Sequence, residues 1–196
     1  VTLPKVEHPD EVRAVDEGLT ELEAHLGLAP RAITVQVLIE SVGAEERAFE
    51  IAAASPRVSA LVFGAFDYWG SLRMVGVPYS ATHPLVDQAR GRIARAAASV
   101  GVPAIAEMTL NYPTKEKSPE AQRAALDECR TDSERARSQG FRGKWAGLPA
   151  QSLVAREAFS LREDELAASV RAARIFLEAE RAGRGAVMID GAMADR

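Results

Sequence analysis

The chain has 196 residues and a mass of 21.1 kDa, which suits one good-sized domain or two small ones. Its 47% hydrophobic and 27% charged residues are typical of a soluble globular protein and exclude a disordered or fibrous chain. The net charge of −4 argues against a protein that binds nucleic acid through its phosphates. A single cysteine, Cys129, excludes an internal disulfide, and the most apolar stretch, residues 96–106, is too short to span a membrane. We therefore expect a cytoplasmic protein without a nucleic-acid or membrane partner.

Short runs rich in β-branched residues alternate along the chain with longer stretches of helical periodicity. This alternation is typical of β-α-β units around a parallel sheet. We predict strands over residues 1–3, 32–39, 59–64, 104–108 and 143–148. We predict one helix that begins at Pro9 and a short one that follows Pro149. Four more helices are predicted over residues 43–54, 84–100, 119–139 and 160–183. Residues 67–82 are predicted to form a polar connection, and the tail beyond residue 183 a small turn-like segment.

The first predicted helix has one apolar stripe whose members are three or four residues apart. They are Val12, Val15, Leu19, Leu22 and Leu26. This spacing predicts that all five side chains lie on one buried face of the helix.

Five strands with their helices fit two architectures, an open doubly wound α/β sheet or part of an eight-stranded barrel, and the pattern alone does not choose between them. No G-x-G-x-x-G segment follows a predicted strand, which argues against a dinucleotide-binding sheet. The character of the sequence changes at Ser160, where the long helix begins. We therefore place a domain boundary between residues 159 and 160.

Acidic residues stand at the ends of two successive predicted strands. Glu40 follows residues 32–39, and Asp67 follows residues 59–64. Adjacent parallel strands lie about 5 Å apart, so the two carboxylates are expected to converge at the carboxyl edge of the sheet. Without a fixed basic partner they would repel each other unless a cation lay between them, and Mg²⁺ accepts one or two carboxylates. The alternative is that each acid caps the following helix, although Ser41 is the more natural cap after Glu40.

Other polar residues form weaker candidates. Those at the remaining strand ends are Lys5, Glu7, Glu107, Asn111 and Lys144. The three histidines are too far apart in the sequence for a zinc site, and no G-x-S-x-G segment is present. Cys129 lies on the apolar stripe of its helix and is expected to be a core residue. The arginines near the end of that helix, Arg130, Arg135 and Arg137, are expected to form a solvated face.

Five segments resemble one known family when they are read in order. They are LPKVEHPDEV, VQVLIES, ALVFGAFDY, GFRGKWAGLPAQ and GAVMIDGAMADR. Together they resemble the citrate lyase β-subunit-like and malyl-CoA lyase family of the HpcH/HpaI aldolase superfamily, over essentially the whole chain. The resemblance implies a (β/α)8 TIM-barrel type of fold, with the C-terminal five β/α units over residues 1–159 and a helical extension with a lid-like tail over residues 160–196. It also implies homotrimers or hexamers.

The resemblance implies a carbon–carbon lyase that interconverts a 3-hydroxyacyl-CoA, such as a malyl-CoA-like or citryl-CoA-like thioester, with an acyl-CoA and a 2-oxo acid. Glu40 and Asp67 match the family's two Mg²⁺-binding carboxylates. The backbone of Gly64 and Ala65 would contact the same substrate, and Lys5 would lie near the substrate or a CoA phosphate.

The resemblance also assigns an acid/base residue. Asp195 matches the C-terminal aspartate that lyase members project into a neighbouring subunit's site, and Asp190 is the competing choice. The family's first three strands, which carry an enolate-stabilising arginine, have no counterpart here, so we expect sequence upstream of Val1. Leu148 stands where many relatives have histidine. A CoA-independent aldolase, a malyl-CoA thioesterase and a non-catalytic fragment or subunit remain alternatives.

Overall fold

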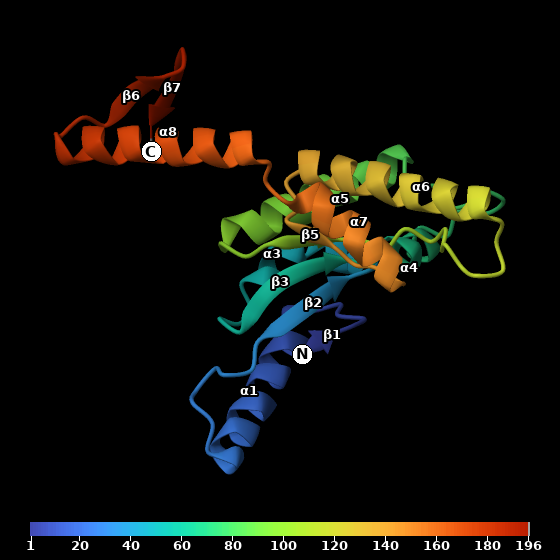
Figure 1. Ribbon diagram of the computed structural model, residues 1–196. Helices are drawn as coiled ribbons and strands as arrows, with labels where there is room; N and C mark the ends of the chain where they lie inside the picture. Colours follow the sequence, from blue (N-terminus) through green and yellow to red (C-terminus); the bar gives the residue numbers. More distant parts are fainter. Residues whose placement is uncertain (196) are drawn as a thin grey trace. The chain divides into compact units, whose positions relative to one another are not determined.

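The computed structural model describes residues 1–195, and the chain divides into two compact units, Val1–Phe159 and Ser160–Arg196. The first unit contains a five-stranded parallel sheet whose strands lie side by side in chain order (Figure 1). The strands are β1 (Thr2–Leu3), β2 (Val35–Ile39), β3 (Val58–Phe63), β4 (Ala104–Ala106) and β5 (Gly143–Lys144). Parallel strands in sequential order with helical crossovers are the arrangement of a partial TIM barrel, so the predicted fold class is confirmed.

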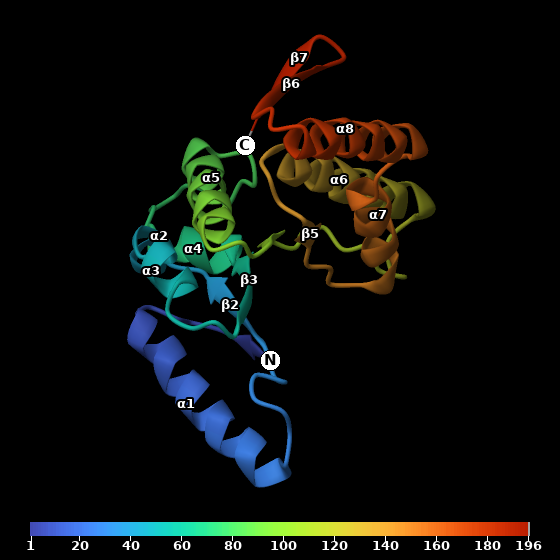
Figure 2. The same ribbon diagram turned by 90° about the vertical axis from the view of Figure 1, so that its left-hand side faces the viewer.

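Helices connect these strands. They are α1 (Pro9–Leu26), α2 (Val42–Glu46), α3 (Ala48–Ala52), α4 (Ala65–Ser71), α5 (Pro84–Ser99), α6 (Pro119–Ser138) and α7 (Pro149–Phe159). Figure 2 shows α2, α3 and α5 gathered beside β2 and β3, while α6 and α7 pack against each other next to β5. Pro9, Pro84, Pro119 and Pro149 each begin a helix, where the missing N–H costs no hydrogen bond.

The two central strands are buried on both faces. Val37 and Leu38 of β2 and Leu61 and Val62 of β3 are successive pairs, and all four residues are buried. Successive strand residues point to opposite faces, so complete burial of neighbours requires cover on both sides of the sheet. The near-continuous apolar runs of these strands supply this surface, and the register pairs Ile39 with Phe63 at the carboxyl ends.

The predicted apolar stripe of α1 is only partly correct. Val12 is buried, and Val15 and Leu19 pack against the core, but Leu22 and Leu26 are exposed. The buried position in this part of the helix is occupied by Glu23, whose carboxylate accepts hydrogen bonds from Arg57. A buried charge with a bidentate partner therefore displaces the expected apolar residues from the inner face of the helix.

Two connections also differ from the prediction. The helix expected over residues 43–54 is divided at Arg47 into α2 and α3. The first residues of the predicted polar connection, from Asp67 onward, are helical instead. They belong to α4, which starts directly after Gly64. Asp67 therefore lies in the first turn of a helix, where the helix dipole favours a negative charge.

The second unit consists of α8 (Glu163–Arg181) and a hairpin of β6 (Ala186–Ile189) and β7 (Ala192–Asp195). The hairpin replaces the turn-like tail that we expected. Asp190 and Gly191 connect its strands with φ angles of 49° and 84°, as a two-residue Asp-Gly turn requires. No helix within residues 1–195 is long and apolar enough to cross a membrane.

Candidate metal centre at the carboxyl ends of β2 and β3

Glu40 and Asp67 lie at neighbouring strand ends, as the sequence predicts. Glu40 follows the last residue of β2 and is 6% exposed. Asp67 is on α4, three residues after Gly64, which ends β3 and donates its N–H to the carbonyl of Ile39 at 2.9 Å. Neither acid is a helix cap, because Ser41 caps α2 by accepting the N–H of Ala44 at 3.0 Å and Gly64 occupies the N-cap position of α4.

Gly64 allows the Glu40 side chain to lie against the backbone of β3. A Cβ atom at residue 64 would come within 2.5 Å of the Glu40 Cβ and 2.9 Å of its Oε2. Real Cβ atoms do not approach other atoms this closely, and a side chain's Cβ cannot swing away as its tip can. A glycine is therefore required here for Glu40 to keep its position.

Lys5 joins the two carboxylates. Its ammonium lies 2.9 Å from Asp67 Oδ1 and 3.7 Å from Glu40 Oε2, and its backbone N–H donates to Glu40 Oε1 at 2.6 Å. The expectation that the acid pair lacks a fixed basic partner is thus wrong. The sheet order explains why: β1 pairs with β2, so the residues after β1 reach the carboxyl end of β2.

Burial and charge act in opposite directions on Glu40. Burial raises the pKa of its carboxyl above the ordinary value, and the nearby Asp67 raises it further, while the Lys5 N–H and ammonium lower it. The hydrogen bond to Asp67 raises the pKa of the Lys5 ammonium. The site therefore holds a buried carboxylate whose charge is only partly compensated by the protein.

The donor set fits Mg²⁺. Mg²⁺ needs one or two carboxylates and keeps other positions for water and substrate oxygens, and the Lys5 ammonium shows that a cation is accommodated between Glu40 and Asp67. Within residues 1–195, no cluster of three or more His, Cys, Asp or Glu side chains is arranged to hold a metal. An all-protein cage is therefore absent from that range, and the carboxylate pair leaves coordination positions for a substrate.

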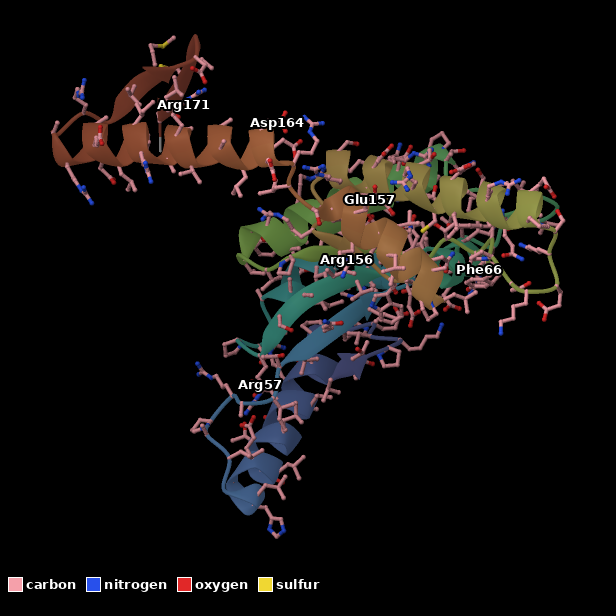
Figure 3. All side chains as sticks on the ribbon, viewed as in Figure 1. Arg57, Phe66, Arg156, Glu157, Asp164 and Arg171 are labelled. Atoms are coloured by element: carbon pink, nitrogen blue, oxygen red, sulfur yellow. The ribbon has the colours of Figure 1, made fainter. Side chains whose placement is uncertain are left out.

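An aromatic group that the sequence analysis did not predict borders this site. Phe66 of α4, which is labelled in Figure 3, directly precedes Asp67 and is 61% exposed. Its ring meets that of Tyr79 edge-on, with the centroids 5.8 Å apart. Trp69 packs edge-on against Tyr79 and His83. Trp69 is a core residue, whereas Phe66 is an exposed apolar residue directly before Asp67 in the chain. An exposed aromatic directly before the strand-end acid was the available signal.

The other polar strand-end residues are engaged elsewhere. Glu107 forms a buried ion pair with Arg90 of α5, and Lys144 donates to the carbonyl of Glu107 at 2.6 Å. Burial lowers the pKa of the Lys144 ammonium. The Asn111 amide donates to Glu128 and its oxygen accepts from Lys117. These groups connect β4 and β5 to the surrounding helices and are not part of the carboxylate pair.

Cys129 is buried in the interior, as predicted. The arginines of α6 were expected to form a solvated face, but two of them hold α7. Arg130 pairs with Glu157 at 3.1 Å, and Arg137 donates to the carbonyl of Ala158. Helix packing therefore uses charges that sequence periodicity assigns to the surface.

The two candidate acid/base residues lie in the second unit and differ in their contacts. Asp190, in the hairpin turn, forms an ion pair with Arg171 of α8. Asp195 is exposed at the end of β7, and its backbone partner across the hairpin is Ala186.

The chain thus folds as a partial TIM barrel with an acid pair at adjacent strand ends. The chain belongs to the family described as a domain of unknown function, DUF6986, whose model matches residues 1–196. It is 28% identical over 209 residues to the L-malyl-CoA/beta-methylmalyl-CoA lyase of Rhodobacter capsulatus. That match covers 100% of this chain but 62% of the relative, so the chain spans less than two thirds of the length of this lyase.

Solved structures agree with this relationship. A citrate lyase from Burkholderia xenovorans LB400 superimposes with a TM-score of 0.75 at 28% identity, covering 99% of this chain and 58% of that one. A citrate lyase beta subunit from M. tuberculosis, complexed with oxaloacetate and magnesium, shares the fold with a TM-score of 0.61 at 22% identity, over 82% of this chain and 61% of that one. The resemblance to the citrate lyase β-subunit-like and malyl-CoA lyase family is confirmed.

Proposed function

We propose that the protein is a Mg²⁺-dependent carbon–carbon lyase that cleaves or forms a 3-hydroxyacyl-CoA thioester of the malyl-CoA or citryl-CoA type. The observation that carries the proposal is the convergence of Glu40 and Asp67 at adjacent strand ends, with a cation between them. The similarity to a malyl-CoA lyase and to a citrate lyase structure supports the thioester substrate, and the magnesium complex of the M. tuberculosis protein supports the metal.

Glu40 and Asp67 would hold the metal, which would supply Lewis-acid polarisation of the oxygen on the hydroxyl-bearing carbon and a binding position for the 2-oxo acid. The Gly64 and Ala65 backbone would contact the substrate, since Gly64 leaves no side chain over Glu40. In the cleavage direction, the bond between the thioester's α-carbon and the hydroxyl-bearing carbon breaks. The hydroxyl proton leaves to water, a 2-oxo acid forms, and the electron pair passes to the α-carbon as a thioester enolate.

Asp195 would protonate the α-carbon of this enolate and would remove the same proton in the direction of synthesis. It is favoured over Asp190, because Asp190 is engaged in an ion pair with Arg171 and occupies the turn of the hairpin. Since family members place this aspartate in a neighbouring subunit's site, we propose a homotrimer or a hexamer. Elution of the protein as a monomer in size-exclusion chromatography would contradict this assembly.

Calorimetric titration of Mg²⁺ in the presence of glyoxylate tests the metal centre. We expect binding by the parent and its loss in both Glu40→Gln and Asp67→Asn. Glu21→Gln is a matched control, because Glu21 is an exposed carboxylate in the later half of α1. Binding that persists in Glu40→Gln and Asp67→Asn would refute the assignment of the two carboxylates.

A second experiment tests the chemistry. Asp195→Asn is expected to lower kcat for cleavage of malyl-CoA by about 10²-fold to 10⁴-fold, the usual contribution of a general acid or base, and to leave Mg²⁺ affinity unchanged. Asp190→Asn is the control and is expected to retain most activity. Release of free malate from malyl-CoA without glyoxylate would identify a thioesterase, and cleavage of aldols that lack CoA would identify a CoA-independent aldolase.

A further inference from the structure

Lys5 contacts the candidate metal centre through two different parts of the residue. Its backbone N–H donates to Glu40 Oε1 at 2.6 Å, in a residue whose φ of 56° is in the left-handed region. Its ammonium lies between Asp67 Oδ1 and Glu40 Oε2. Left-handed backbone is uncommon for a residue with a side chain, so this turn is specifically held.

The two contacts differ in how readily they can be broken. The backbone contact reaches a carboxylate that is only 5% exposed and is fixed by the turn. The ammonium is at the end of a flexible four-carbon side chain that is 65% exposed, and its partner Asp67 is 54% exposed. An ion pair with this exposure is weak, because water screens the charges and the lysine gains conformational freedom when it leaves.

We propose that the Lys5 ammonium is a displaceable cation that holds Glu40 and Asp67 together until a divalent cation arrives, and that it then pairs with the carboxylate of the incoming 2-oxo acid. The proposal rests on the proposed function, since it concerns the same two carboxylates. The backbone N–H of Lys5 remains on Glu40 Oε1 throughout and keeps the carboxylate oriented.

Competition is the physical reason for the displacement. Asp67 and Glu40, which would hold a divalent cation, are the carboxylates that the ammonium contacts. The two cations would therefore compete for the same carboxylates and would repel each other at close range. Once displaced from Glu40 and Asp67, the Lys5 ammonium would still lie close to the site and could pair with the carboxylate of the substrate. Lys5 thus weakens the binding of metal alone and favours the binding of metal together with an anionic substrate, which is positive coupling between the two ligands.

Calorimetry of Mg²⁺ binding to the whole chain, with and without glyoxylate, tests this inference. Without glyoxylate, Lys5→Met is expected to bind Mg²⁺ about fivefold more tightly than the parent, since an exposed ion pair contributes up to about that factor. With glyoxylate, the parent is expected to gain several-fold more in Mg²⁺ affinity than Lys5→Met. Lys5→Arg, which keeps the positive charge beside the carboxylates, is expected to bind Mg²⁺ without glyoxylate more weakly than either neutral variant.

Lys5→Gln is the second neutral variant and replaces Lys5→Met if that variant does not fold, as judged by circular dichroism. Equal Mg²⁺ affinity in the parent and the neutral variants, together with an equal effect of glyoxylate, would overturn the inference and leave Lys5 as a structural ion pair. In that case the loss of binding in Glu40→Gln would still support the metal centre. Absence of Mg²⁺ binding by the folded parent would overturn both proposals.

Discussion

The buried charges at the two ends of strands β2 and β3 differ in how completely they are paired. At the amino end, Arg57 is 2% exposed, and its guanidinium donates to Asp16, Thr20, Glu23 and the carbonyl of Ile33. All five of its N–H groups have acceptors. At the carboxyl end, the buried Glu40 has one backbone donor and one exposed ammonium. Figure 3 shows Arg57 near the first end and Phe66 near the second.

This difference is what we expect between a structural charge and one that binds a ligand. A buried ion pair is stable only when its geometry satisfies every polar atom, which is the case around Arg57. A buried carboxylate with incomplete partners is stable in the fold only because surrounding contacts maintain it, and it attracts a ligand that completes it. The same sheet therefore has a fully hydrogen-bonded charge network at the amino ends of its strands and an incompletely paired acid pair at the carboxyl ends, which we propose as the metal site.

The largest expected effect is at the Arg57 network. Arg57→Met leaves Glu23 and Asp16 without their cation, and we expect Tm to fall by about 10 °C, as is typical when one partner of a buried pair is removed from a protein of this size. Thermal unfolding followed by circular dichroism measures the change. A Tm within about 2 °C of the parent would mean that the network contributes little to stability, and the contrast between the two ends would fail.

A fall in pH is expected to change the stability contributions of the two ends in opposite directions. The hydrogen bonds from Arg57 lower the pKa of Glu23 from 4.5 to about 2, so its contribution to stability is complete above pH 4.5 and is lost as the pH falls towards 2. Burial raises the pKa of Glu40, so protonation as the pH falls relieves a cost and adds stability.

Urea unfolding between pH 7 and pH 2 distinguishes these contributions. Glu23→Gln is expected to be less stable than the parent at pH 7 and to lose less stability in acid. Glu40→Gln is expected to be as stable as the parent or more stable at pH 7, with the difference shrinking as the pH falls. If both variants showed the same dependence on pH, the distinction between a satisfied and an unsatisfied carboxylate would be wrong.

Gly64→Ala is expected to disturb the acid pair at the carboxyl end of the strands and to leave the Arg57 network at the amino end unchanged. The added Cβ meets Glu40 Cβ at 2.5 Å, and we expect a loss of about 1–3 kcal/mol in stability, as for other overpacked sites. The displaced carboxylate should also bind Mg²⁺ about tenfold more weakly, the lower end of the range for a disturbed metal-supporting contact.

Gly70→Ala is the matched control for this substitution. It lies on the same helix, α4, and a Cβ there meets no atom within 4 Å. It should keep the Mg²⁺ affinity of the parent in calorimetry and be equally stable or slightly more stable, since alanine favours helix. An equal loss of Mg²⁺ affinity in both variants would show that the contact with Glu40 is not the cause.

The smallest expected effect is on the stability of Lys5→Met. Both members of the pair with Asp67 are more than half exposed, so Tm should change by less than about 2 °C. Differential scanning calorimetry of this variant beside Arg57→Met measures the two ends under one condition. A large loss of Tm in Lys5→Met would mean that its ammonium is a structural element and cannot leave the carboxylates at low cost.

The sequence by itself determined the parallel α/β class, because alternating apolar runs and helical periods lead to β-α-β units, and it placed Glu40 and Asp67 at adjacent strand ends. It also held a local pattern that we missed, the Asp190–Gly191 turn between alternating residues, which is a hairpin signal. Local periodicity and turn chemistry are properties of neighbouring residues, and a sequence displays them directly.

Only the tertiary structure decided which charges meet. Lys5 reaches Glu40 because β1 pairs with β2, and Arg57 reaches Glu23 because the later half of α1 lies near the start of β3. The exposure of Leu22 and the burial of Glu23 follow from that second contact. Partners that lie 35 and 34 residues apart in the chain become neighbours only through strand order and packing. For this reason the sequence named both acids and Lys5 as residues at strand ends, but it did not show that the Lys5 ammonium pairs with the two carboxylates.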